Sequence, residues 1–510
     1  MRVENSVKNL GVSWVGYALK LILSFIARSI FIKVLNQEYL GINGLFTNIL
    51  SLLSLAELGV GSAIIFSLYK PIHENDTKNI VSIMQFYKKV YTGIGIIIGV
   101  LGISLMPFLG IFIKDIPNIS NLKLIYGLYV FNTAVSYFFV YKSAFITANQ
   151  KNYIVTLNTN IFNLFGIIFQ TVALIVTSNF IFYLIIQVIF TILGNANIAR
   201  IANNMYPFLK NKNKVKLDKN IYHDIIKNTG ALVLHKIGGV IVFSTDNVIL
   251  SKIVGLVSVG LYSNYSMILN SLESIMSQVF TAISASVGDL GTTKDTKKKI
   301  DMFYIAFFTD FWIYSFASVS LIVLFNPLIK LWVGENYILG IPIVLVLILN
   351  FYIKGMRNSV LTFKDAFGLF WYNKYMPIGE CIINLGASIL LAKMYGTIGV
   401  FIGTTISSVA TCLWIEPKVL YKYGFKVSIK KYIIRYIIYF MLTCGIGFIT
   451  YMLCDFLHGN TLIIFISKLL ICLAIPNIIV ILIFCRTKEF KYLWNIFMKL
   501  TIKIRVKIYK

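Results

Sequence analysis

The chain has 510 residues, of which 58% are hydrophobic and 13% charged, with a formal net charge of +27 and a mean hydropathy of +0.79. A soluble domain cannot bury so much apolar surface, so the composition predicts an all-α polytopic membrane protein. The positive charge does not indicate nucleic-acid binding, because the basic residues are spread over many polar segments instead of one domain.

Fourteen apolar segments have the length of a membrane-spanning helix, for which about 20 residues suffice. They are residues 10–33, 42–68, 90–113, 123–146, 154–177, 180–200, 229–252, 259–287, 303–326, 339–363, 377–395, 399–417, 432–454 and 461–484. We expect Pro71, just after the second segment, to stop its helix at the water boundary. From Arg486 the tail alternates basic and apolar residues, as an amphipathic interfacial segment does.

The basic residues divide unevenly between the polar segments on the two sides of these spans. With residues at span ends counted in the adjoining segment, 34 of the 47 lysines and arginines lie in one set of alternate segments, six in the other set and seven inside spans. Cytoplasmic segments of membrane proteins carry this excess of positive charge. The sequence therefore predicts that both termini are cytoplasmic.

The first two spans recur later in the chain, which predicts two pseudo-symmetric bundles related by a parallel repeat. Leu40-Gly41-Ile42 aligns with Val259-Gly260-Leu261, 219 residues further on. The predicted organisation is a six-helix lobe over 1–210, a basic linker over 211–228, a second six-helix lobe over 229–423, and two further helices with a basic tail over 424–510.

Charged residues inside the spans are the most informative side chains, because each costs about 2.5–3.5 kcal/mol at the centre of a membrane helix. They are Lys20, Arg28, Glu57, Lys142, Lys236, Asp246, Glu273, Asp310, Lys354, Arg357, Glu380 and Lys468. We expect Lys142, Lys468 and Glu380 to reach water at helix ends. We expect another group to face a water-filled cavity, and its members are Lys20, Arg28, Lys236, Asp246, Lys354 and Arg357.

Depth along the helices, at about 1.5 Å per residue, suggests which of these charges are level. Lys20 and Glu57 lie about 20 and 22 Å from the outer ends of their spans, and Lys236 and Glu273 about 24 and 21 Å. Each lobe is therefore expected to hold a Lys–Glu pair between its first two helices. Helix rotation cannot be read from the sequence, so these pairs are hypotheses about geometry.

No catalytic or metal-binding pattern is present in the sequence. There is no glycine-rich phosphate loop and no Ser/His/Asp grouping, and the cysteines and histidines lack the spacing of metal ligands. The sequence therefore predicts a protein that is not an enzyme and binds no metal and no cofactor.

Several motifs resemble those of the MATE-like MOP superfamily, and specifically the bacterial polysaccharide flippases that serve O-antigen and capsule synthesis. They are Arg28, Tyr39-Leu40-Gly41-Ile42-Asn43-Gly44-Leu45-Phe46, Glu57-Leu58-Gly59, Leu68-Tyr69-Lys70-Pro71, Asp246, Tyr262-Ser263-Asn264-Tyr265, Gly368-Leu369-Phe370-Trp371 and Met376-Pro377-Ile378-Gly379-Glu380. The similarity covers roughly residues 1–430, and its most specific part is the first 90 residues.

The resemblance implies two six-helix lobes that face each other across a central cavity, with two further helices. It also implies a substrate, an oligosaccharide on a polyprenyl diphosphate, which moves from the inner to the outer leaflet of the cytoplasmic membrane by alternating access. Membrane lipids are expected partners, and a polysaccharide polymerase and glycosyltransferases are candidate partners. Cations suit a diphosphate, and the planar fork of arginine suits it best.

Three alternatives remain open at this point. A multidrug exporter of the same fold would favour acidic and aromatic side chains for cationic drugs, and a lipid II flippase would differ only in its substrate. A membrane scaffold for glycan synthesis would have no functional need for buried charge.

Two predictions assign roles to particular residues. Lys354 and Arg357, three apart, are expected to share one helix face and to contact the substrate phosphates. Arg28 and Asp246 lie about 8 and 9 Å from the outer ends of their spans, at nearly equivalent repeat positions. We expect them to form an outer gate between the two lobes, which arriving diphosphate would open by competing for Arg28. The alternative is that both residues face the outer headgroups.

Overall fold

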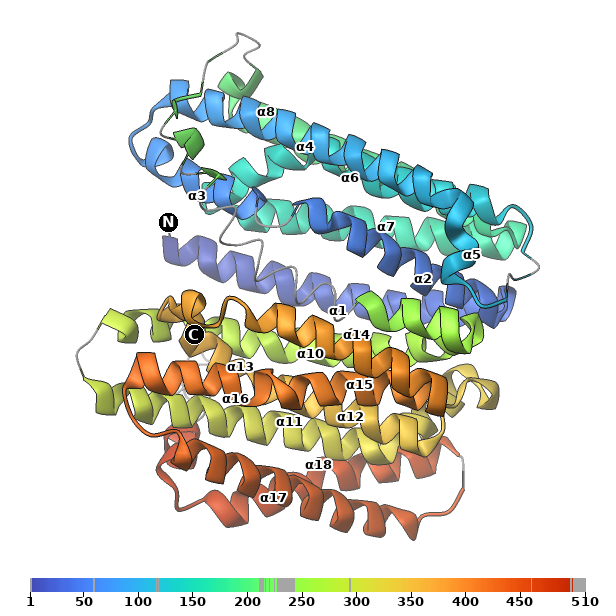
Figure 1. Ribbon diagram of the computed structural model, residues 1–510, viewed down its shortest axis with the longest axis vertical. Helices are drawn as coiled ribbons and strands as arrows, with labels where there is room; N and C mark the ends of the chain where they lie inside the picture. Colours follow the sequence, from blue (N-terminus) through green and yellow to red (C-terminus); the bar gives the residue numbers. More distant parts are fainter. Residues whose placement is uncertain are drawn as a thin grey trace, which may run out of the picture. The chain divides into compact units, whose positions relative to one another are not determined.

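The computed structural model describes residues 2–57, 60–115, 117, 119–210, 215, 217–219, 221–223, 225–226, 244–292, 295–459, 461–495 and 498. These residues form helices joined by turns, with no strand among them. The chain divides into two compact units, residues 1–260 and 261–510 (Figure 1). The division falls after the predicted linker, within the helix that begins at Leu256.

The first unit is built mainly of long antiparallel helices. They are α1 (Arg2–Val34), α2 (Gln37–Leu53), α3 (Val60–His73), α4 (Thr77–Leu105), α5 (Leu109–Phe112), α6 (Leu122–Ala148), α7 (Asn152–Thr177) and α8 (Phe180–Met205). α6 packs between α4 and α8, and α1 packs along α7 (Figure 1).

Short polar side chains set where helices of this unit begin. Asn36 accepts hydrogen bonds from the backbone N–H groups of Glu38 and Tyr39 at the start of α2, which satisfies donors that have no partner within the helix. Asp76 does the same for Asn79 at the start of α4. That backbone hydrogen bond holds the pKa of the Asp76 carboxyl below its ordinary value.

The predicted span 42–68 is not one continuous helix. α2 ends at Leu53, a 3₁₀ turn covers Ser54–Glu57, and α3 begins at Val60. Within the turn the Glu57 carboxylate accepts a hydrogen bond of 2.5 Å from the Tyr91 hydroxyl of α4. The prediction that Pro71 stops the helix is also wrong, since α3 continues to His73 with the proline inside its last turn.

The second unit is arranged around α11. Its helices are α10 (Leu256–Thr292), α11 (Thr296–Val333), α12 (Ile341–Gly355), α13 (Asn358–Ala366), α14 (Met376–Tyr395), α15 (Thr397–Ala410), α16 (Cys412–Val419), α17 (Lys430–Asp455) and α18 (Leu462–Phe484). α11 contacts α12, α17 and α18. The Phe311 ring stacks on Tyr439 of α17 at 4.2 Å between centroids, and Trp312 donates to Asn477 of α18 at 2.9 Å.

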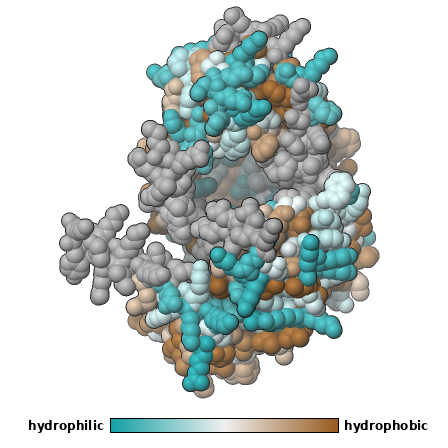
Figure 2. Space-filling view, turned by 90° about the vertical axis from the view of Figure 1, so that its left-hand side faces the viewer, coloured by the Kyte–Doolittle hydropathy of each residue, from teal (hydrophilic) through white to brown (hydrophobic). Residues whose placement is uncertain are grey.

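Within the described part of the chain, ten helical segments are long and apolar enough to cross a membrane. They correspond to the predicted spans three to six and nine to fourteen, so the protein is a multi-pass membrane protein. The predicted spans 10–33, 42–68 and 259–287 are not among the ten, most of the predicted span 229–252 lies outside the described residues, and the number fourteen is not confirmed. Figure 2 views one end of the helices, where hydrophilic side chains gather in both units, as expected for a surface in water.

Two glycines at equivalent positions of the predicted repeat allow α2 and the first residues of α10, which belong to the first unit, to meet at backbone contact. A Cβ atom on Gly41 would lie 2.2 Å from the carbonyl oxygen of Leu256, and one on Gly260 would lie 2.5 Å from that of Gln37. Small residues permit such close approach between membrane helices. The sequence repeat thus has a counterpart in packing.

Gly41→Ala is expected to destabilise the protein, because a backbone carbonyl cannot yield as a flexible side chain can. Overpacking costs about 1–3 kcal/mol, whereas replacing a helical glycine with alanine otherwise gains about 1 kcal/mol. Melting temperatures in detergent measure the balance. Gly445→Ala in α17 is the matched control, since a Cβ there meets nothing within 4 Å. Equal melting temperatures for the two variants would contradict the contact.

Candidate functional site

Arg28 of α1 lies in a polar patch formed by side chains from four helices of the first unit. Arg28 is half-buried, and the hydroxyl groups of Tyr129 (α6) and Tyr183 (α8) are close enough to act on its charge. Tyr129 donates to the side-chain oxygen of Asn43 (α2) at 2.5 Å, and Tyr183 packs edge-on against Phe31. Tyrosine hydroxyls and an arginine together can hydrogen-bond an anionic or hydroxylated ligand.

The predicted pair of Lys20 with Glu57 is not formed in this structure. Lys20 is exposed and makes no ion pair with any residue that the structure describes. Glu57 instead accepts from Tyr91. The depth estimate assumed one straight helix, and the 3₁₀ turn at Ser54–Glu57 carries the carboxylate toward α4.

Glu273 of α10 has a partner that the sequence did not predict. Its carboxylate accepts a hydrogen bond of 2.6 Å from the Lys354 ammonium at the end of α12. The Lys354 side chain is 41% exposed and that of Glu273 22%, so this ion pair can be reached from outside the unit. The predicted partner, Lys236, lies outside the described residues.

Arg357 lies in a buried cluster of charges within the second unit. Its Nε and Nη2 atoms donate to the two carboxylate oxygens of Glu416 at 3.0 and 3.2 Å. Lys364 lies 3.6 Å from the same carboxylate, and Glu380 lies 4.0 Å from Arg357. Only 3% of the Glu416 side chain and 5% of the Lys364 side chain are exposed. The Glu380 side chain is itself only 11% exposed, so the prediction that it reaches water at a helix end is wrong.

Lys354 and Arg357 do not share the face of one helix, so that prediction is also wrong. α12 ends at Gly355, whose missing side chain leaves room for the Tyr314 ring. α13 then begins at Asn358, and the fully buried Asp310 accepts from the backbone N–H of Ser359 at 2.7 Å. The break turns Lys354 toward Glu273 and Arg357 toward Glu416. Asp310 thus caps a helix.

Asp246, the other residue of the predicted gate, is buried at 7% exposure within the part of the chain that forms the first unit. The gate stays a prediction. Sequence inspection did not single out Tyr129, Tyr183, Lys364 or Glu416, whose roles depend on neighbours far away in the chain.

A family model described as polysaccharide biosynthesis protein matches residues 6–284. No curated protein sequence matches the chain significantly.

Solved structures of two kinds of transporter share the fold. A lipid II flippase, MurJ, in an inward closed conformation matches with a TM-score of 0.63 at 16% identity, over 92% of this chain and 98% of that chain. An inward-facing multidrug resistance MATE family transporter of the MOP superfamily matches at 0.64 and 15% identity, over 82% and 99%. A MOP superfamily transporter from Pyrococcus furiosus matches at 0.55 and 13% identity, over 84% and 97%.

These likenesses confirm the predicted fold class. The family model covers more than half of the sequence. The chain therefore belongs to the polysaccharide biosynthesis protein family.

Proposed function

We propose that the protein is a flippase that moves polyprenyl-diphosphate-linked oligosaccharide units from the inner to the outer leaflet of the bacterial cytoplasmic membrane by alternating access. The observation that carries the proposal is the family match over residues 6–284. The partly accessible cations Arg28 and Lys354 support it chemically, because a diphosphate is bound best by charged donors.

Deletion of the gene tests this function in cells. The proposal expects lipid-linked oligosaccharide to accumulate in the inner leaflet, with loss of surface polysaccharide. The MATE transporter likeness makes a multidrug exporter the second candidate. That candidate expects normal surface polysaccharide and increased sensitivity to cationic drugs. Loss of peptidoglycan precursor export with normal surface polysaccharide would point to lipid II.

The ion pair of Lys354 with Glu273 would be contested by substrate. A diphosphate offers Lys354 more negative charge than one carboxylate does, and the pair is accessible. A ligand shifts a conformational equilibrium only through its different affinities for the two states. Competition for Lys354 would supply such a difference.

Lys354→Gln is expected to lower export by about 10-fold or more, because a hydrogen bond to a charged group contributes at least about 1.5 kcal/mol. Lys354→Arg is expected to retain most activity. Lys330→Gln is the matched control, since Lys330 lies in the same unit as Lys354 and also forms an ion pair, with the exposed Glu335. Equal export by the Lys354→Gln and Lys330→Gln variants would remove Lys354 from the substrate path.

Both termini are proposed to lie in the cytoplasm, on the evidence of the 34-to-6 distribution of basic residues. Reporter fusions after Lys510 and within residues 203–228 are expected to report a cytoplasmic location. An extracytoplasmic signal from either fusion would mean that at least one of the predicted spans does not cross the membrane.

A further inference from the structure

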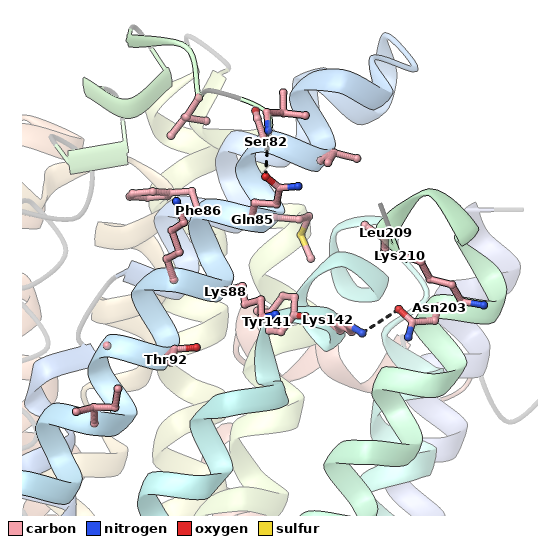
Figure 3. A pocket seen from close by; sticks show the side chains of 17 residues that line it. Ser82, Gln85, Phe86, Lys88, Thr92, Tyr141, Lys142, Asn203, Leu209 and Lys210 are labelled. Carbon is pink, nitrogen blue, oxygen red and sulfur yellow. Dashed lines mark hydrogen bonds between the residues drawn. The ribbon is translucent and has the colours of Figure 1, made fainter. Parts of the chain in front are cut away.

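One end of the first unit contains a basic pocket that the proposed transport function does not use. A cavity of about 1400 Å³ lies between α4, α6 and the segment after α8 (Figure 3). A second cavity of about 490 Å³ adjoins it, because the walls of both include Lys88, Tyr141, Lys142, Asn203 and Lys210.

Among the described residues that line the pocket, every charged side chain is positive. Lys88, Lys89, Lys142 and Lys210 line the larger cavity, and Arg200 lines the smaller one. No acidic side chain is among the described residues that line either cavity. Lys88 and Lys210 are close enough to Lys142 to repel its charge. Like charges held together without an acidic partner favour an anionic ligand.

Polar groups hold the pocket in shape without neutralising it. The Lys142 ammonium donates to the side-chain oxygen of Asn203 on α8 at 2.9 Å (Figure 3). The Gln85 side-chain oxygen accepts from the backbone N–H of Val215 at 3.2 Å, which ties the segment after α8 to α4. Both acceptors are uncharged amides, so the positive charge remains available to a ligand.

An apolar stripe on α4 continues from the basic pocket. Lys89, Gly93 and Ile96 line the cavity, and Val100 follows at the spacing that keeps residues on one helix face. Ile96 and Val100 are 54% and 62% exposed, as residues facing lipid chains are. A soluble phosphate compound would not need this stripe, whereas the acyl chains of a lipid would lie along it.

We propose that this pocket binds the phosphate headgroup of an anionic membrane phospholipid, with its acyl chains along α4. The chemistry of recognition is charge-assisted hydrogen bonding from lysine ammonium groups to phosphate oxygens. Typical ligand pockets have volumes of about 300–1,000 Å³. The larger cavity exceeds this range, so it has room for the headgroup and its glycerol. The proposal does not depend on which substrate the protein transports.

Equilibrium binding of fluorescent phosphatidylglycerol to the full-length protein in neutral detergent tests the site. The test variant is Lys88→Gln/Lys142→Gln/Lys210→Gln, and the control is Lys297→Gln/Lys298→Gln/Lys430→Gln, which removes the same charge from exposed positions of the second unit. Each lysine near a phosphate changes affinity about fivefold. We therefore expect the test variant to bind on the order of 100-fold more weakly, and the control to bind like the unmodified protein.

Competitors distinguish the sources of phosphate. Unlabelled phosphatidylglycerol is expected to displace the probe, whereas phosphatidylcholine and inorganic diphosphate are expected to displace it poorly. Equal loss of binding in the test and control variants, or equal displacement by phosphatidylcholine, would overturn the site. Displacement by inorganic diphosphate as strong as by the lipid would assign the pocket to soluble phosphate compounds. If the triple variant does not fold, Lys88→Gln/Lys89→Gln, at two exposed positions, tests the same prediction.

Because binding is measured without transport, the result is independent of the flippase proposal. A protein that binds phosphatidylglycerol at this pocket and moves no oligosaccharide would contradict only the proposed transport function. Failure of lipid binding with normal export would contradict only the lipid site.

Discussion

Arg28→Gln is expected to lower export of lipid-linked oligosaccharide on the order of 100-fold while the protein stays folded and inserted. Glutamine keeps a polar side chain beside Tyr129 and Tyr183 but removes the charge. The charge-assisted hydrogen bonds that a guanidinium gives a phosphate are worth about 3 kcal/mol, which corresponds to that factor. Export in cells, normalised to the amount of protein in the membrane, measures the loss.

Two variants sharpen the interpretation of this result. Arg28→Lys keeps the charge without the planar fork and is expected to export at an intermediate rate. Arg486→Gln, which removes an exposed arginine after α18, is expected to export normally. If Arg28→Gln and Arg486→Gln export equally, Arg28 does not contact the substrate.

Arg28 is also proposed to form an outer gate with Asp246, and crosslinking tests this contact. A Cys pair at positions 28 and 246 is expected to crosslink in the closed state, and less so when substrate is supplied. In a separate variant, the charge swap Arg28→Asp with Asp246→Arg is expected to restore the ion pair that either single change removes, but not substrate binding. A Cys pair that never crosslinks would mean that the two residues do not meet.

Glu416→Gln is expected to destabilise the protein by about 3–5 kcal/mol, because it leaves Arg357 and Lys364 buried without their shared carboxylate. Thermal unfolding in detergent measures the effect. Glu335→Gln is the control, since the Glu335 side chain that pairs with Lys330 is 68% exposed and exposed pairs contribute about 0–1 kcal/mol. The double variant Arg357→Gln/Glu416→Gln is expected to be less destabilised than the sum of the single variants.

This experiment also decides what Arg357 does. If Glu416→Gln has the melting temperature of Glu335→Gln but loses export, the charge cluster around Arg357 contacts the substrate and does not stabilise the fold. If both Arg357→Gln and Glu416→Gln lose stability together, the cluster holds α13 and α16 in place.

The sequence predicted the helical membrane class and most long helices, because an apolar run of about 20 residues has few alternatives in a bilayer. It also predicted the repeat whose glycines, Gly41 and Gly260, pack helices at backbone contact. These features depend on residues close together in the chain or on a pattern that recurs.

The helix breaks and the charge partners could not be predicted in this way. The turn at Ser54–Glu57 accompanies a hydrogen bond from Tyr91, and the break after Gly355 accompanies the Tyr314 ring and the Asp310 cap. Glu273 and Lys354 are 81 positions apart. Such partners depend on the rotation of each helix about its axis, which hydropathy and depth do not determine.

Flipping in proteoliposomes tests the central claim most directly. Purified protein is reconstituted with a fluorescent polyprenyl-diphosphate oligosaccharide, and a membrane-impermeant quencher reports the fraction of lipid in the outer leaflet. We expect the unmodified protein to expose lipid that stays protected in protein-free vesicles, and the Arg28→Gln variant to leave it protected. The flippase function would be contradicted if the fluorescent lipid stayed protected from the quencher in vesicles with the unmodified protein. Movement of a cationic drug in the same vesicles would then favour multidrug export.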